Sequence, residues 1–131
     1  MKVVVLLAEP DHYARWTAMS DDEQQAVFDT FHAFDRAIGD RGGSLLGGEG
    51  LAGPRSARTL RPGPGRLVTD GPYAEAAEQL GGFFIVEAVS IESVLEAARV
   101  LPDTWSIEVR PVEGSVEPSV GAAAGTEGSR S

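Results

Sequence analysis

The chain has 131 residues, which is enough for one domain with one hydrophobic core. Its net charge is −9, from 20 acidic and 11 basic side chains, whereas proteins that bind nucleic acids or anionic membranes need clustered cations. We therefore expect no direct binding to DNA, RNA or such a membrane. The absence of cysteine excludes disulfides, zinc–thiolate sites and thiol nucleophiles.

The chain begins with an apolar run over residues 3–8, which is typical of a strand buried on both faces. The run stops at Glu9-Pro10-Asp11 without the small-residue pattern of a cleavage site, so it does not resemble a signal peptide. No segment approaches the ~20 apolar residues that a membrane span needs. We expect a cytoplasmic protein.

A polar stretch with His12, Tyr13 and Trp16 follows the first strand and is expected to be a loop. Ser20 and the glutamate three positions later match a capping box, which predicts the start of a helix. Apolar side chains then recur at helical spacing until Gly42-Gly43 ends that helix. Residues 44–51 are predicted to form a second strand.

The second half repeats this order after an excursion. Residues 57–61 and 66–69 flank Pro62-Gly63-Pro64-Gly65, which predicts a hairpin. A short helical or irregular piece over 74–80 precedes a strand over 82–89. Ser90 is expected to cap a helix that Pro102 stops, and apolar and polar residues then alternate over 105–110 in a final strand. From residue 113 the chain lacks periodicity, so we predict one domain over 1–112 and a disordered tail over 113–131.

The order β-α-β, hairpin, β-α-β predicts an α+β fold, namely a ferredoxin-like split βαβ sheet with an inserted hairpin and both helices on one face. The second apolar face of the sheet would then have no cover from its own chain. A second copy of the sheet, related by two-fold symmetry, is the simplest cover. We therefore expect a homodimer.

Several ordered motifs resemble the DGPF branch of the YCII-related family. They are Thr69-Asp70-Gly71-Pro72-Tyr73-Ala74-Glu75, Glu78-Gln79-Leu80-Gly81-Gly82-Phe83 and Ile107-Glu108-Val109-Arg110-Pro111, with weaker similarity at Gly47-Gly48-Glu49-Gly50-Leu51 and His32-Ala33-Phe34. The resemblance implies that two such chains pair as a dimeric α+β barrel, in agreement with the homodimer expected from the uncovered sheet face. It also implies small-molecule chemistry with a His/Asp pair, as proposed for dehydrochlorinase-type members, or an association with extracytoplasmic-function sigma factors.

Two positions depart from the family pattern. Tyr73 stands where the family name has Phe, which adds a hydroxyl. Ala76-Ala77 stand where members often have Thr-Lys, so any role of that lysine is absent from this chain.

The candidate catalytic pair is His32 and Asp70. His32 follows Phe31 on the first predicted helix, and imidazole exchanges protons near neutral pH. A partly buried histidine bonded to a carbonyl is the competing interpretation. Asp70 begins a turn, where its carboxylate either orients His32 or forms an Asx-turn with its own backbone.

Four further residues are candidates for substrate binding. Glu49 lies between glycines that let a ligand approach the backbone, and Tyr13 lies in the loop after the first strand. The planar guanidinium group of Arg110 is suited to bind an anionic group of a substrate, or else it pairs with a neighbour such as Glu108. Tyr73 carries the additional hydroxyl of the turn motif. For each of them an ordinary surface role is the alternative.

No phosphate loop, dinucleotide fingerprint or serine nucleophile elbow is present, and two histidines without cysteine make a weak metal set. We therefore expect no cofactor and no metal. Two functions remain open. One is a cofactor-independent enzyme of the lyase, isomerase or dehydrochlorinase type that acts on a small molecule. The other is a non-catalytic ligand-binding or regulatory module associated with a sigma factor, and a dimer that only mediates interactions and binds no ligand is the minimal alternative to both.

Overall fold

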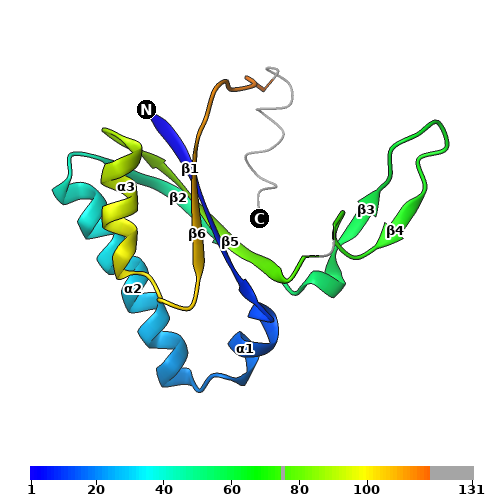
Figure 1. The fold of residues 1–131 in the computed structure, drawn as a ribbon, viewed down its shortest axis with the longest axis horizontal. Helices are drawn as coiled ribbons and strands as arrows, with labels where there is room; N and C mark the ends of the chain where they lie inside the picture. The colour runs from blue at the N-terminus through cyan, green and yellow to red at the C-terminus, as the bar shows by residue number, and fades with distance from the viewer. Residues whose placement is uncertain (75, 119–131) are drawn as a thin grey trace.

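The computed structural model describes residues 1–74 and 76–118. Two helices, α2 and α3, lie on one side of a four-stranded sheet, and a long hairpin projects away from them on the other side (Figure 1). Residues 113–118 form neither helix nor strand, and the rest of the predicted tail lies outside the described residues.

The elements follow one another in the predicted order, with one additional helix. Their bounds are β1 Lys2–Pro10, α1 His12–Ala18, α2 Asp21–Asp40, β2 Ser44–Gly50, β3 Arg58–Leu60, β4 Val68–Asp70, β5 Glu78–Glu87, α3 Ile91–Ala97 and β6 Ser106–Pro111. Short 3-10 turns cover Pro54–Ser56 and Ala98–Val100. The main sheet has the order β2-β5-β1-β6 with antiparallel neighbours, and β3 and β4 form a separate ribbon. This confirms the ferredoxin-like α+β fold.

Both predicted helix starts are confirmed by their caps. The Glu23 backbone N–H donates to Ser20 Oγ at 3.1 Å, and the Ser20 N–H donates to Glu23 Oε1 at 2.8 Å. Ser90 and Ser93 form the equivalent reciprocal pair at α3. These bonds satisfy N–H groups that have no partner inside a helix, and so they set where each helix begins.

Two segments differ from the sequence prediction. The stretch expected to be a loop after β1 contains helix α1, which starts after Asp11 in a left-handed conformation with φ of 53°. Strand β5 begins at Glu78, inside the piece expected to be helical or irregular, because Glu78, Gln79 and Leu80 continue the ladder with β1. In both places pairing and packing with distant residues override the local pattern.

The core lies between the sheet and the helices. Alternate residues of β1, Val3, Val5 and Leu7, face α2 and α3 and are buried there against Phe34 and Ile38. Glu9 continues this alternation and is also buried. It is the one charged residue at a core-facing position of β1, and it lies at the end of the sheet near α1.

The opposite face of the sheet is the open face. Its centre consists of two cross-strand apolar pairs, Val4 with Ile85 and Leu6 with Phe83, all of them partly exposed. Arg110 of β6 lies opposite Val4 and is exposed. Neither α2 nor α3 lies on this face (Figure 1). Among the described residues, no helix is long and apolar enough to cross a membrane.

Candidate functional site: an aromatic cavity with a buried Glu9–His12 pair

A cavity of about 420 Å³ lies on the helix side of the sheet, where β2 and β5 meet α1 and α2. Much of its wall is aromatic, with contributions from Tyr13, Trp16, Phe28, Phe31, Phe84 and Trp105. The volume falls in the range of small-molecule sites. Among the described residues, no lysine or arginine lines the cavity, so its interior suits an uncharged, ring-containing molecule.

The rings of the wall hold one another in place. Phe31 is the central ring, because its centroid lies 5.8 Å from Phe28, 5.4 Å from Phe84 and 5.8 Å from Trp105. Trp16 of α1 packs edge-on against Phe28 at 5.4 Å. Edge-to-face pairs of this kind add to the stability that burial provides. The cavity is therefore built from contacts between three separate elements.

Glu9 is the buried charge behind this wall. Its residue is 2% exposed, and its carboxylate accepts three hydrogen bonds. Oε1 accepts from Trp105 Nε1 at 3.0 Å and lies 2.8 Å from His12 Nδ1, and Oε2 accepts from Thr104 Oγ1 at 3.3 Å. Arg15 Nε lies 3.9 Å from Oε2. A buried carboxylate is retained only where such partners replace water.

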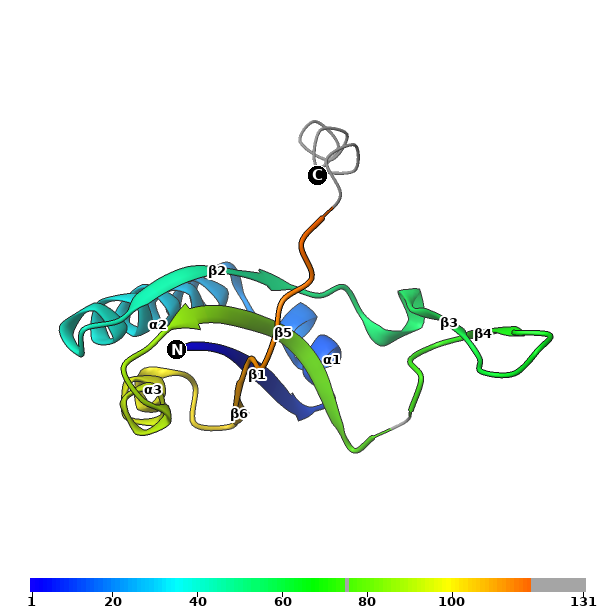
Figure 2. The same ribbon diagram turned by 90° about the horizontal axis from the view of Figure 1, so that it is seen from above.

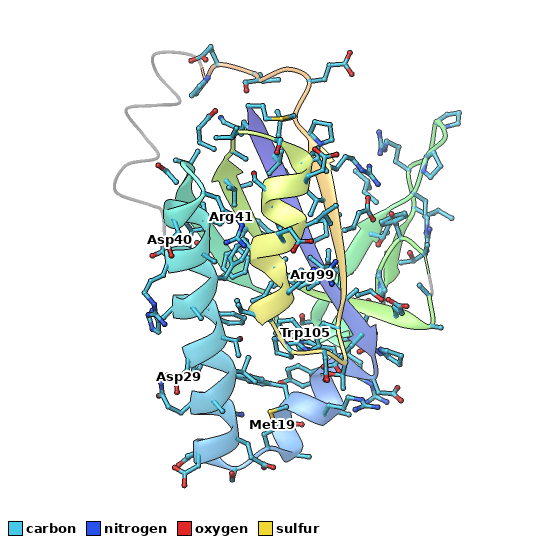
Figure 3. The ribbon with its side chains drawn as sticks, turned by 60° about the vertical axis from the view of Figure 1, so that its left-hand side comes forward. Met19, Asp29, Asp40, Arg41, Arg99 and Trp105 are labelled. Atoms are coloured by element: carbon cyan, nitrogen blue, oxygen red, sulfur yellow. The ribbon has the colours of Figure 1, made fainter. Side chains whose placement is uncertain are left out.

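His12 joins this carboxylate to the cavity. It belongs to α1, lines the cavity, and has a side chain that is 17% exposed. A carboxylate accepts hydrogen bonds and does not donate them, so the contact with Glu9 requires the proton of His12 to be on Nδ1. In the neutral ring Nε2 then carries the free lone pair. Trp105, which packs edge-on against the imidazole at 5.6 Å, lies below the end of α3 and above α1 (Figure 3).

Gly81 makes room for the imidazole. It is the additional residue of a β-bulge, because Leu7 pairs with Gly82 while Ala8 pairs with Leu80. A Cβ at position 81 would lie 2.3 Å from His12 Cδ2 and 2.4 Å from Nε2. No side chain therefore fits there, and the Nε2 edge lies directly against the backbone of a residue that also lines the cavity. Bulges often reorient side chains beside functional sites.

The pair expected from the sequence, His32 and Asp70, is not formed within the chain. His32 is exposed on α2 and does not line this cavity, because it lies about 100° round the helix from Phe31 and 200° from Phe34, which both pack toward the sheet. The Asp70 side chain is 90% exposed on β4, with Arg58 Nε 3.5 Å from its Oδ1. Helix α2 and the hairpin lie on opposite sides of the sheet (Figure 1).

The four expected binding residues are divided among three places. Tyr13 and Glu49 line the cavity, although Glu49 lies opposite Phe83 in the ladder, which directs its side chain to the open face. Tyr73 lines a separate hollow of about 920 Å³ at the base of the hairpin. Arg110 is exposed on β6 and donates from Nε to Glu108 Oε2 at 2.9 Å, as in the alternative interpretation of that residue.

Comparison with known proteins places the chain in a family. The YCII-related domain family matches residues 1–113. This chain belongs to the YCII-related domain family. The expectation drawn from the motifs is thus confirmed at the level of the family, and assignment to the DGPF branch stays a prediction. The YCII-related domain is also 37% identical, over 101 residues, to an uncharacterized protein of Rhizobium meliloti (strain 1021), across 73% of this chain and 81% of that protein.

Within this YCII-related domain, the sequence did contain one sign of the Glu9–His12 pair. Glu9 occupies the next inward position after Val3, Val5 and Leu7, so the alternation of β1 placed a carboxylate in the core. His12 was recognised only as part of a loop that often carries ligand contacts. The sign was incomplete because the partner that buries Glu9, Trp105, is 96 positions away in the chain.

Proposed function

We propose that this YCII-related protein is a cofactor-independent enzyme that transfers a proton on a small, uncharged cyclic molecule held in the aromatic cavity. The observation that carries the proposal is the contact between the buried Glu9 carboxylate and the Nδ1 of His12, a residue that lines the cavity. A histidine oriented by a buried carboxylate is the common arrangement of a general base.

In this mechanism His12 Nε2 accepts a proton from a carbon of the bound molecule, and Glu9 stabilises the imidazolium that results. The electron pair of the broken C–H bond forms a double bond to the neighbouring carbon. That carbon either loses a leaving group, which departs with its bonding pair, or already belongs to a double bond, whose electron pair then shifts to the far carbon and takes the proton back from the imidazolium. The reaction is then an elimination or an isomerisation. Aromatic walls exclude water and hold the ring of the substrate, so Glu9 and His12 act in a site of low polarity.

The two histidines of the chain supply the test. Both tryptophans line the cavity, so quenching of their fluorescence by a library of uncharged cyclic compounds identifies ligands. Turnover of these ligands is then followed by mass spectrometry. We expect His12→Gln to retain binding and to lower turnover by about 10²–10⁴-fold, the usual contribution of a general base. His32→Gln, the matched exposed control, leaves turnover unchanged.

The same experiment separates this proposal from a non-catalytic binding module. Ligands that bind in the cavity but are not converted, with affinities that are the same in wild type and His12→Gln, contradict the enzymatic proposal and favour the binding module. If His32→Gln loses turnover and His12→Gln keeps it, the catalytic site contains His32, as chosen from the sequence, and not His12.

We also propose that the protein is a homodimer in which the open faces of two sheets pack together. The apolar pairs Val4–Ile85 and Leu6–Phe83 support this, because a sheet needs cover on its second apolar face. We expect sedimentation to show a dimer for wild type and a monomer for Leu6→Glu, which places a charge at the centre of the contact. Glu108→Gln, a change at the polar margin of the same face, remains dimeric. A wild-type monomer at high protein concentration contradicts the proposal.

A further inference from the structure

The hairpin that leaves the sheet between β2 and β5 is referred to as the arm and comprises residues 53–74. Its ribbon pairs Arg58 with Asp70, Thr59 with Thr69 and Leu60 with Val68. Figure 1 shows the arm projecting away from α2 and α3, on the side of the open face, and Figure 2 shows it extending beyond the ends of β2 and β5. A two-stranded ribbon without further packing is marginally stable in water, so the arm needs a surface to rest on.

One face of the ribbon carries exposed apolar side chains. Leu60 and Val68 lie opposite each other and are 53% and 52% exposed, and Leu67 beside them is 75% exposed. Directly paired residues of antiparallel strands share a face, so Leu60 and Val68 form one apolar patch next to the Arg58–Asp70 pair. Adjacent exposed apolar residues of this kind mark a surface that contacts another molecule.

The arm has the opposite charge to the rest of the chain. It contains four arginines, at 55, 58, 61 and 66, and one acidic residue, Asp70, for a net charge of +3. The whole chain carries −9, so everything outside the arm carries −12. Among the described residues, Arg55 and Arg66 form no ion pair, and both are exposed. An acidic protein surface is the complement of this arm, and the body of a second copy is such a surface.

We propose that the arm of one copy docks on the acidic body of a second copy, with the Leu60–Val68 patch against it and Arg55 and Arg66 facing carboxylates. The proposal rests on the homodimer proposed above. A second copy seated on the open face lies on the side toward which the arm projects, so the arm extends the contact that the sheets begin. The arm then packs against the surface of the partner, and that surface covers the ribbon.

The cysteine-free chain allows a direct test of this contact. Gly65 in the loop of the arm has open space around its Cβ position, so Gly65→Cys introduces a unique thiol without a clash. The thiol is labelled with a photoreactive benzophenone in a mixture of ¹⁴N and ¹⁵N protein, and cross-linked peptides are identified by mass spectrometry. We expect links between isotopically different copies, from the arm to acidic segments of the body. Links confined to one copy, or none in a sample that sedimentation shows to be dimeric, overturn the arm contact and leave the sheet dimer standing.

Charge reversal supplies the second measurement. Arg55→Glu with Arg66→Glu changes the arm from +3 to −1, and we expect the dimer dissociation constant to rise by at least about tenfold at low salt, because like charges then face each other. Arg55→Lys with Arg66→Lys is the matched control and keeps the wild-type constant within about threefold, since exposed charges tolerate this exchange. An unchanged constant in the Glu variant overturns the proposal. A wild-type monomer overturns both this proposal and the sheet dimer.

Discussion

Glu9→Ala is expected to lower the free energy of unfolding by about 3 kcal/mol, because it removes a buried acceptor that three donors share. Trp105 Nε1, Thr104 Oγ1 and His12 Nδ1 all contact the Glu9 carboxylate, which is 2% exposed. Without it, Trp105 Nε1 and His12 Nδ1, which belong to partly buried residues, lose their acceptor. Urea unfolding, followed by the fluorescence of the two tryptophans, measures the change.

Glu96→Ala is the matched control for this prediction. Glu96 also accepts a hydrogen bond, from Arg99 Nε at 2.9 Å, but both side chains are more than half exposed. Exposed ion pairs contribute little, so we expect a change within about 0.5 kcal/mol. If Glu9→Ala and Glu96→Ala lower the stability equally, the buried carboxylate does not organise this end of the sheet.

Gly81→Ala is expected to displace the His12 ring and to reduce turnover as much as His12→Gln does. The new methyl group would lie 2.3–2.4 Å from His12 Cδ2 and Nε2, well inside van der Waals contact, and the ring has Trp105 and Glu9 on its other sides. Movement of the ring breaks the contact with Glu9. Overpacking of this kind costs about 1–3 kcal/mol in stability. The ¹H–¹⁵N spectrum of the His12 ring and the turnover assay record the two consequences.

Two controls show whether the clash with His12 is the cause. Gly47→Ala adds a methyl group to the neighbouring strand at a position that does not line the cavity, where nothing lies within 4 Å of the Cβ position, and should leave turnover unchanged. In a His12→Ala background the clash is absent, so Gly81→Ala should cost much less stability than it does in wild type. Equal costs in the two backgrounds would assign the effect of Gly81→Ala to the bulge itself.

Local patterns in the sequence were sufficient to predict the fold class. The signals were the continuous apolar run of β1, the alternation in β6, the capping residues Ser20 and Ser90, and the Pro-Gly loop of the hairpin. Each is a property of neighbouring residues and depends on backbone geometry within a few positions. The motifs from Asp70 onward were sufficient to identify the family. Helix α1 and the first residues of β5 were not predicted, because contacts with Phe28 and β1 stabilise them.

The sequence by itself thus determined the elements other than α1 and the start of β5, their order and the family, because these follow from short-range periodicity and motifs. Only the tertiary structure decided the site. Glu9 and His12 are three positions apart, but Gly81 and Trp105 come from two other parts of the chain, and no local pattern relates these three parts. His32 was a candidate because its neighbours in the sequence are apolar, but its position around the axis of α2 leaves its side chain exposed to solvent. Burial of a charge requires partners on every side, and only the packed fold brings those partners together.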